Sequence, residues 1–171
     1  TAYVGPSVGA SSTSNSYVAS TVYAVPMFIP NTYTYAKFGV IRSVVVANAQ
    51  ERLGIYADSS GTPGSLLADL GTIPATTTVG FKTITPGSAV SLTGPSWVWL
   101  AVVPQVAVNT LVSTVGTATG SAVAVANITP HLSGVTQGFA GSTAVPDVLP
   151  SSWGSTFTER AVVPLVYISR I

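Results

Sequence analysis

The sequence predicts an all-β protein, built as a sandwich or barrel of short strands. Its apolar stretches are dominated by Val, Thr, Ile, Tyr, Phe and Trp, the residue types that suit a pleated and half-buried surface. Sixteen glycines and twelve prolines interrupt the chain at short intervals, which leaves little room for a ten-residue helix. Short strands separated by turn signals are typical of antiparallel sandwiches and barrels.

The chain has 171 residues, a length that suits one domain with a sizeable core. Its opening contains Gly5, Pro6 and Gly9, followed by a polar run over residues 11–16. Such a composition is typical of an extended or flexible segment. We therefore expect an extended N-terminal arm over residues 1–16 and a single β-sandwich domain over residues 17–171.

Nine segments of the expected domain should form strands, of which the second should be bent or broken. Within residues 51–57 the period is two, so that Leu53 and Ile55 should point inward and Tyr56 outward. Only residues 65–70 could instead form a short helical turn. The expected strands are Tyr17–Ala24, Tyr33–Ala47, Glu51–Ala57, Leu66–Ile73, Gly80–Ile84, Ser96–Val103, Leu111–Val115, Ala122–Asn127 and Ala161–Ile168.

Two of these strands are apolar on both faces. Residues 97–103 read WVWLAVV, and a strand of that kind must be covered on both sides, by a second sheet and a loop or by a neighbouring subunit. The closing segment, residues 162–168, contains Pro164, which cannot donate to a ladder and favours an edge or a bulge. An apolar edge strand would aggregate unless a partner covered it, so both segments favour an oligomer.

The charge content also favours association. Only 6% of the residues are charged, against roughly 25% in ordinary soluble domains, and the net charge is +1. So little charge gives a free monomer little electrostatic repulsion, and we expect much of the surface to be buried against other copies. No nucleic-acid partner is expected, because the cations form no cluster. They are Lys37, Arg42, Arg52, Lys82, Arg160 and Arg170.

The residue inventory also bears on disulfides and on membranes. The chain has no cysteine, so we expect neither a disulfide nor a thiolate metal site. No membrane span is expected, because Gly, Pro, Ser and Thr interrupt every apolar run before it reaches the ~18 residues that a spanning helix needs. The first residues lack a basic and then apolar leader, so we expect no signal peptide in this chain.

Catalytic chemistry has few candidate groups, and we expect no catalytic residue, no metal and no cofactor. The single histidine, His131, is interpreted as a loop residue rather than as part of a triad, since no G-x-S-x-G elbow is present. Residues 58–64, DSSGTPG, use the residue types of a hairpin turn and lack the closing carboxylate of a calcium loop. Turn formation or surface solvation explains each acid better than a glycosidase pair does. The acids are Glu51, Asp58, Asp69, Asp147 and Glu159.

The aromatic residues offer two kinds of binding site. Trp153, in a loop, and Tyr56, facing outward, are the candidates for stacking against a glycan. Trp97 and Trp99 lie at alternate positions of one strand, so they share a face; core packing is the favoured interpretation, and a groove is the alternative. Together with Tyr167, these two tryptophans are also candidate assembly contacts.

Residues 52–69, RLGIYADSSGTPGSLLAD, resemble a "GIY-D-GG-PG-LL" hairpin found in β-sandwich domains of bacteriophage virion proteins and of some bacterial surface proteins. Residues 23–30 and 97–103 are similar to neighbouring strands of that family, so the resemblance spans residues 23–171. Ser60 stands where the pattern often has the first of its two glycines, which leaves the turn type open.

The resemblance implies a jelly-roll-like sandwich, often a homotrimer, on the virion surface. We accordingly expect a non-enzymatic structural protein that decorates the capsid or builds a short fibre through contacts with itself and with other virion proteins. The alternative is a tail-fibre module that binds a host surface glycan. A glycan-degrading enzyme would need two neighbouring carboxylates in a cleft, and it is the weakest of the three hypotheses.

Overall fold

The computed structural model describes residues 11–44, 46–105, 109–115, 138–141, 147–153, 156–160 and 162–171. These residues form twelve strands and no helix, and no helix in the described part could therefore cross a membrane. The strands are β1 (Ser11–Tyr17), β2 (Tyr23–Ile29), β3 (Tyr33–Arg42), β4 (Glu51–Ser59), β5 (Thr62–Ile73), β6 (Gly80–Ile84), β7 (Val90–Leu92), β8 (Ser96–Pro104), β9 (Asn109–Val115), β10 (Gly138–Gly141), β11 (Phe157–Arg160) and β12 (Tyr167–Arg170).

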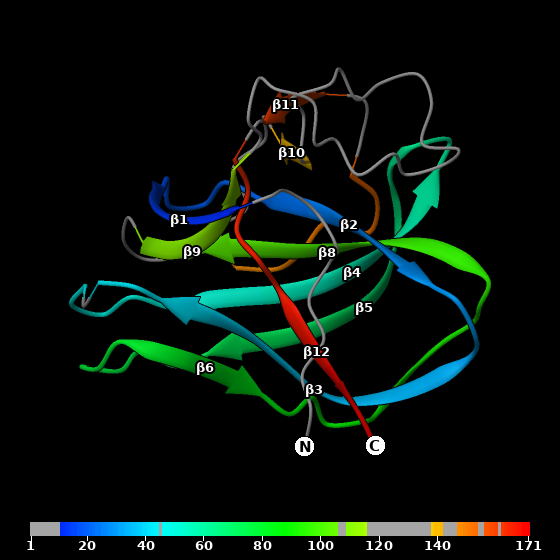
Figure 1. The fold of residues 1–171 in the computed structure, drawn as a ribbon, viewed down its shortest axis with the longest axis horizontal. Coiled ribbons are helices and arrows are strands. Elements are labelled where there is room, and N and C mark those ends of the chain that lie inside the picture. The colour runs from blue at the N-terminus through cyan, green and yellow to red at the C-terminus, as the bar shows by residue number, and fades with distance from the viewer. Residues whose placement is uncertain are drawn as a thin grey trace.

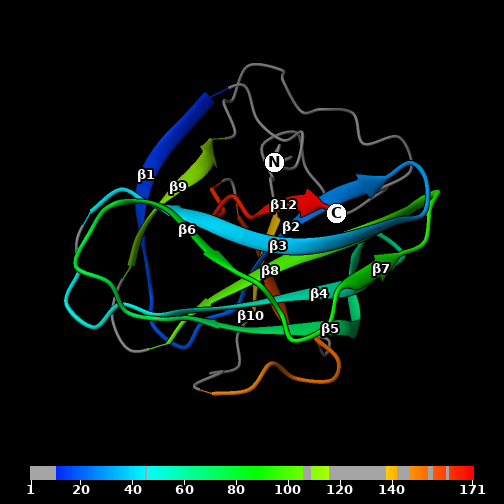
Figure 2. The same ribbon diagram turned by 90° about the horizontal axis from the view of Figure 1, so that it is seen from below.

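The strands form two antiparallel sheets that pack face to face (Figures 1 and 2). Sheet A has the order β1-β9-β3-β12, and β6 and β7 also pair with β3. Sheet B has the order β11-β10-β2-β8-β4-β5. The expected all-β, antiparallel sandwich is confirmed; its jelly-roll character stays a prediction.

Alternate residues of the central strand β8 enter two separate apolar clusters. Val98, Leu100 and Val102 belong to the inner core between the two sheets. Trp99, Ala101 and Val103 face the other way, into an outer core on the far side of sheet B. Both faces of this strand are buried, as the sequence predicts, because β8 lies between β2 and β4 in a sheet that is covered on both sides.

The outer core is closed by a segment of the same chain, residues 147–153, which we call the strap. Leu149 and Trp153 of the strap are buried against sheet B. The strap also bonds to the start of β5, because the Leu66 amide donates to the Ser151 carbonyl at 2.8 Å and the Trp153 amide donates to the Gly64 carbonyl at 3.0 Å. The strap thus extends sheet B beyond its edge strand β5 while covering the outer face.

A tight approach shows how closely the strap follows the sheet. A Cβ atom added to Gly54 of β4 would lie only 2.2 Å from Cδ1 of Leu149. Gly54 therefore leaves the space that Leu149 fills, and a larger residue there would lift the strap.

The turn between β4 and β5 has two residues, Ser60 and Gly61. Both have positive φ values, 54° and 85°, as a type I′ hairpin requires. The Asp58 carboxylate accepts the Gly61 amide at 3.1 Å, in the manner expected of a turn aspartate. The structure thus answers the open question about this turn: Ser60 adopts the backbone conformation that a glycine would adopt more easily.

Several strand boundaries differ from the expected ones. Residues 11–16, expected within the arm, form β1 together with Tyr17, and β1 pairs with β9; residues 1–10 lie outside the described part. The expected strand at residues 17–24 is wrong, because β2 begins at Tyr23. Residues 65–70 lie in β5 and form no helical turn. At the end of the chain, the ladder with β3 begins only at Tyr167. The expected strand at residues 122–127 lies outside the described residues.

One buried ion pair joins the two sheets. The guanidinium of Arg42, at the end of β3, donates from Nε to Oε1 of Glu51, at the start of β4, at 2.7 Å. A second bond joins the Arg42 Nη2 and Glu51 Oε2 atoms, and both side chains are almost fully buried. Glu51 is therefore not a solvated surface acid, as the sequence suggested, but one half of a bidentate pair.

Candidate functional site

Tyr56 and Trp153, the two candidate glycan contacts, lie together under the strap. Tyr56 is 0% exposed and Trp153 is 6% exposed, and their ring centroids are 5.2 Å apart. The Tyr56 hydroxyl donates to the Pro150 carbonyl at 3.1 Å. Burial raises the pKa of Tyr56, and the nearby Asp69 charge adds to the shift. These rings fill the outer core and present no open face for stacking.

Trp99, a candidate assembly contact, is completely buried in the same outer core. Its indole Nε1 donates to Oδ1 of Asp58 at 2.8 Å, and its ring packs at 5.2 Å from Phe139. The favoured interpretation of Trp99 as a core residue agrees with this position. The other oxygen of the Asp58 carboxylate accepts a hydrogen bond from the Gly61 amide. The indole and this amide together hold the carboxylate in place.

Trp97, two residues earlier on β8, is only partly buried. Its ring lies 5.1 Å from that of Phe28 on β2, and Phe28 is 44% exposed. This exposed aromatic pair lies on the outer face of sheet B. Phe28 is not among the candidate residues from the sequence, although it lies within residues 23–30, the segment similar to a strand of the virion family. The register of β2, in which Phe28 pairs with Trp97, supplies the missing signal.

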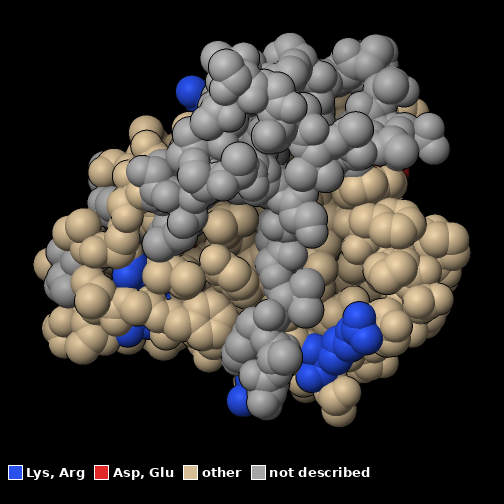
Figure 3. Space-filling model, in the orientation of Figure 1, with Lys and Arg blue, Asp and Glu red and all other residues tan. Residues whose placement is uncertain are grey.

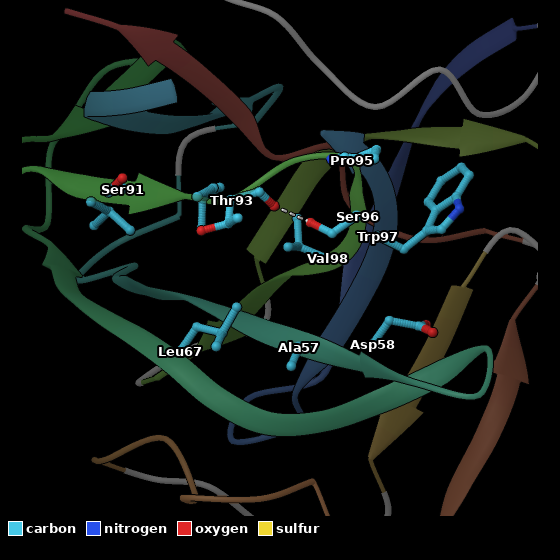
Figure 4. Close-up of a pocket in the computed structure, with 11 residues that line it drawn as sticks. Ala57, Asp58, Leu67, Ser91, Thr93, Pro95, Ser96, Trp97 and Val98 are labelled. Atoms are coloured by element: carbon cyan, nitrogen blue, oxygen red, sulfur yellow. Dashed lines mark hydrogen bonds between the residues drawn. The ribbon is translucent and has the colours of Figure 1, made fainter. Parts of the chain in front are cut away.

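A groove of about 450 Å³ opens beside Trp97 (Figure 4). One wall comes from the β4–β5 hairpin and contains Ala57, Asp58 and Leu67. The other walls come from β7, the following loop and the start of β8. Those walls contribute Val90, Ser91, Leu92, Thr93, Pro95, Ser96, Trp97 and Val98.

The groove lining is mixed in character. Three hydroxyls and one carboxylate supply its polar groups, from Ser91, Thr93, Ser96 and Asp58. The Ser96 hydroxyl donates to the Thr93 carbonyl and so retains its own acceptor capacity. No Lys or Arg is among the described residues that line it. The arrangement can therefore accept hydrogen bonds and stack against a ring, and its charge disfavours anions.

Tyr167, the remaining candidate assembly contact, lies on the outer face of sheet A. Its ring meets that of Phe81 edge-on at 5.6 Å, and Phe81 is 39% exposed. Gly39 lies beneath this pair, since a Cβ atom there would lie 3.0 Å from the Phe81 ring. Burial raises the pKa of Tyr167. We call Phe81 and Tyr167 the sheet A pair; it is separate from Trp97 and Trp99, which lie on sheet B.

The acidic residues lie in different places. Asp69 pairs with Arg52 at 2.8 Å, Glu51 pairs with Arg42, and Asp58 is held by Trp99 and Gly61. Within the described residues, no three His, Cys, Asp or Glu side chains lie close enough to hold a metal ion. His131 lies outside the described residues.

Comparison with known proteins assigns no family. No protein-family model matches the chain, and no curated protein matches it either.

Proposed function

We propose that this chain is a non-enzymatic structural protein of a bacteriophage virion, a capsid decoration or a short fibre, that acts through contacts between copies and with other virion proteins. The observation that carries the proposal is a surface that combines very little charge with exposed apolar side chains. In the view of Figure 3, basic groups are isolated and almost all of the remaining described surface is uncharged.

The few charges are largely engaged with neighbouring groups. Arg42 is buried with Glu51, Arg52 pairs with Asp69, and the Arg170 guanidinium lies 3.5 Å from the centre of the Tyr33 ring. Meanwhile several large apolar side chains are exposed by 39–81%. They are Val18, Phe28, Val44, Leu67, Val79, Phe81, Val148 and Ile171. A protein with so little charge and with exposed apolar groups tends to associate.

The two-faced strands no longer support an oligomer. The outer face of β8 is covered by the chain's own strap, and Val163 and Val166 belong to its own inner core. The support for assembly therefore comes from the surface alone. Of the three predicted contacts, Tyr167 and Trp97 retain exposed area, and Trp99 is enclosed.

Sedimentation over a range of protein concentrations tests the proposal. The unmodified chain should form a defined oligomer, a trimer if the resemblance holds. Phe81→Asp should shift it toward monomer, because a carboxylate at a contact between copies would be buried without a partner. Thr158→Asp, at an exposed polar position of sheet B, adds the same charge and is the matched control, so it should leave the oligomer intact.

A monomer at every concentration, with no binding to the parent particle, would contradict the proposal. Antibody-gold labelling of that particle then gives the position. Label spread over the head would identify a capsid decoration, and label at the tail would identify a fibre.

A second candidate function is a receptor-binding module for a host surface glycan. The observation that favours it is the exposed aromatic pair of Phe28 and Trp97 beside the groove. The glycan contacts that the sequence predicts, Tyr56 and Trp153, are enclosed and cannot supply such a surface.

A further inference from the structure

We infer that the groove beside Trp97 binds a neutral saccharide. The inference rests on the groove's own geometry and does not require the assembly role, since the sheet A pair lies on the other sheet. It moves any glycan contact from Tyr56 and Trp153 to Trp97, Phe28 and Asp58.

The size and position of the groove suit a small ligand. Its volume of about 450 Å³ lies in the range of roughly 300–1,000 Å³ that small-molecule sites occupy. Ala57 and Val98 are cross-strand partners at the end of the β4–β8 ladder, so two of the lining residues sit on rigid elements. Figure 4 shows Trp97 and Asp58 on one side of this site, with Leu67 and Ser91 on the other.

The aromatic pair provides a surface for the apolar face of a sugar ring. Trp97 lines the groove directly, and the tilted contact with Phe28 holds the indole on one side. When the apolar face of a sugar ring stacks on an exposed aromatic pair, both surfaces are removed from water, and this burial favours binding. Leu67, which is 51% exposed, adds apolar area at the opposite wall.

The polar groups suit a ligand that carries several hydroxyls. Each Asp58 oxygen accepts one protein hydrogen bond, from Trp99 Nε1 or from the Gly61 amide, and retains room for another. The carboxylate is therefore held in place before a ligand arrives, which lowers the entropic cost of binding. Sugar hydroxyls can donate to the remaining lone pairs of this carboxylate while the sugar ring lies against Trp97.

The same groups argue against other ligands. A purely apolar ligand would displace water from Asp58 and the hydroxyls without replacing those hydrogen bonds. A phosphate or an acidic sugar would meet the Asp58 carboxylate, and no cation among the described lining residues would offset that charge. A neutral hexose or N-acetylhexosamine satisfies both conditions.

Tryptophan fluorescence offers a direct test, because Trp99 and Trp153 are buried and only Trp97 is open to a soluble quencher. Glucose, galactose, N-acetylglucosamine and their short oligomers should be titrated against the full chain in the presence of acrylamide. At least one of them should protect Trp97 from quenching and shift its indole N–H resonance. Glucuronic acid should have no effect.

Variants sharpen the test. Phe28→Ala should weaken the sugar at least severalfold, and Asp58→Asn should reduce the preference for neutral over acidic sugars. Phe81→Ala, on sheet A, should bind as the unmodified chain does. Circular dichroism should confirm that each variant folds.

Two outcomes would overturn the inference. One is that no sugar in the panel changes the quenching or the indole resonance at millimolar concentration. The other is that Trp97 becomes protected as the protein concentration rises without sugar, which would make this face a contact between copies. Neither outcome affects the Phe81→Asp sedimentation test, so the two proposals can fail separately.

Discussion

Arg42 and Glu51 show how a single pair of charges can link two layers of the fold. They belong to different sheets, they are almost fully buried, and the Arg42 guanidinium also donates to the Thr76 hydroxyl at 2.9 Å. The guanidinium also donates to the Pro74 carbonyl at 3.3 Å. These two bonds tie residues 74–76 to the buried ion pair.

Arg42→Met should destabilise the protein by about 3–5 kcal/mol, because the buried Glu51 carboxylate would lose the guanidinium that neutralises its charge. Urea unfolding followed by circular dichroism measures the change. Arg52→Met is the control: it breaks the more exposed pair with Asp69 and should cost no more than about 1 kcal/mol. Equal losses in the two variants would contradict the role assigned to burial.

Tyr56 makes the folding stability sensitive to high pH. Because its pKa is raised in the folded state, the unfolded chain loses the tyrosine proton first as the pH rises above about 10. The contribution is fully present below that pH and declines above it, by about 1.4 kcal/mol per pH unit for each such tyrosine.

Tyr56→Phe should reduce the loss of stability above about pH 10 by the contribution of one tyrosine. It should also lower the free energy of unfolding at neutral pH by about 1 kcal/mol, because the hydrogen bond to Pro150 is lost. Urea unfolding at several pH values between neutrality and pH 11 gives both quantities. An unchanged alkaline slope would show that Tyr56 is not the group responsible.

At the scale of elements, the strap is the feature that most changes how the sequence is understood. Trp99, Tyr56 and Trp153 share the outer core that it closes, and its backbone pairs with the start of β5. An apolar strand face, which looked like an interface with another subunit, is instead an interior surface of one chain.

Leu149→Ala should cost about 2–4 kcal/mol and should raise the acrylamide quenching of Trp153, because the strap would lose the side chain that packs on Gly54. Its neighbour Val148, which is 67% exposed, provides the matched control: Val148→Ala should change the stability by less than about 0.5 kcal/mol. Loss of stability without a change at Trp153 would mean that the strap does not move as a unit.

Strands with a strong apolar pattern could be predicted from the sequence. Gly80–Ile84 was placed with its observed bounds, and β4, β5, β8 and β9 each contain their expected segments. β1 could not be predicted in this way, because its SSTSNSY sequence has no apolar alternation and becomes a strand only by pairing with β9. The apolar pattern did not predict β2 beyond Ala24, whereas the resemblance over residues 23–30 covers all of this strand. Pro26 is tolerated because β10 pairs with β2 only at Tyr23 and Ala24, away from the proline.

For the candidate site, the residue types were predictable but their exposure was not. The sequence indicated that Trp97 and Trp99 share a face, and they do, yet one is half open and the other is enclosed. That difference depends on where Phe139 and the strap lie, and those segments are distant in the chain. The groove likewise combines β4, β5, β7 and β8, which no local pattern could bring together.

At the scale of the whole molecule, the low charge should make the folding stability nearly independent of salt. The buried Arg42–Glu51 pair is shielded from ions, and the partly exposed Arg52–Asp69 pair contributes little. We expect urea unfolding in low and in physiological sodium chloride to agree within about 0.5 kcal/mol. A larger change would show that charge interactions carry more of the stability than these pairs suggest.

The order of strands within the sheets also has a consequence for how fast the chain folds. β1 pairs with β9, β3 with β12, and β8 with β2 and β4. Most strand pairs are therefore far apart in the sequence, and the chain must lose the entropy of closing a long loop before such a pair can form. Non-local pairings of this kind place folding in the range of milliseconds to seconds. We expect the β4–β5 hairpin, which a two-residue turn closes, to form first. Until distant segments reach it, both apolar faces of β8 remain exposed, so refolding yield should fall as the protein concentration rises.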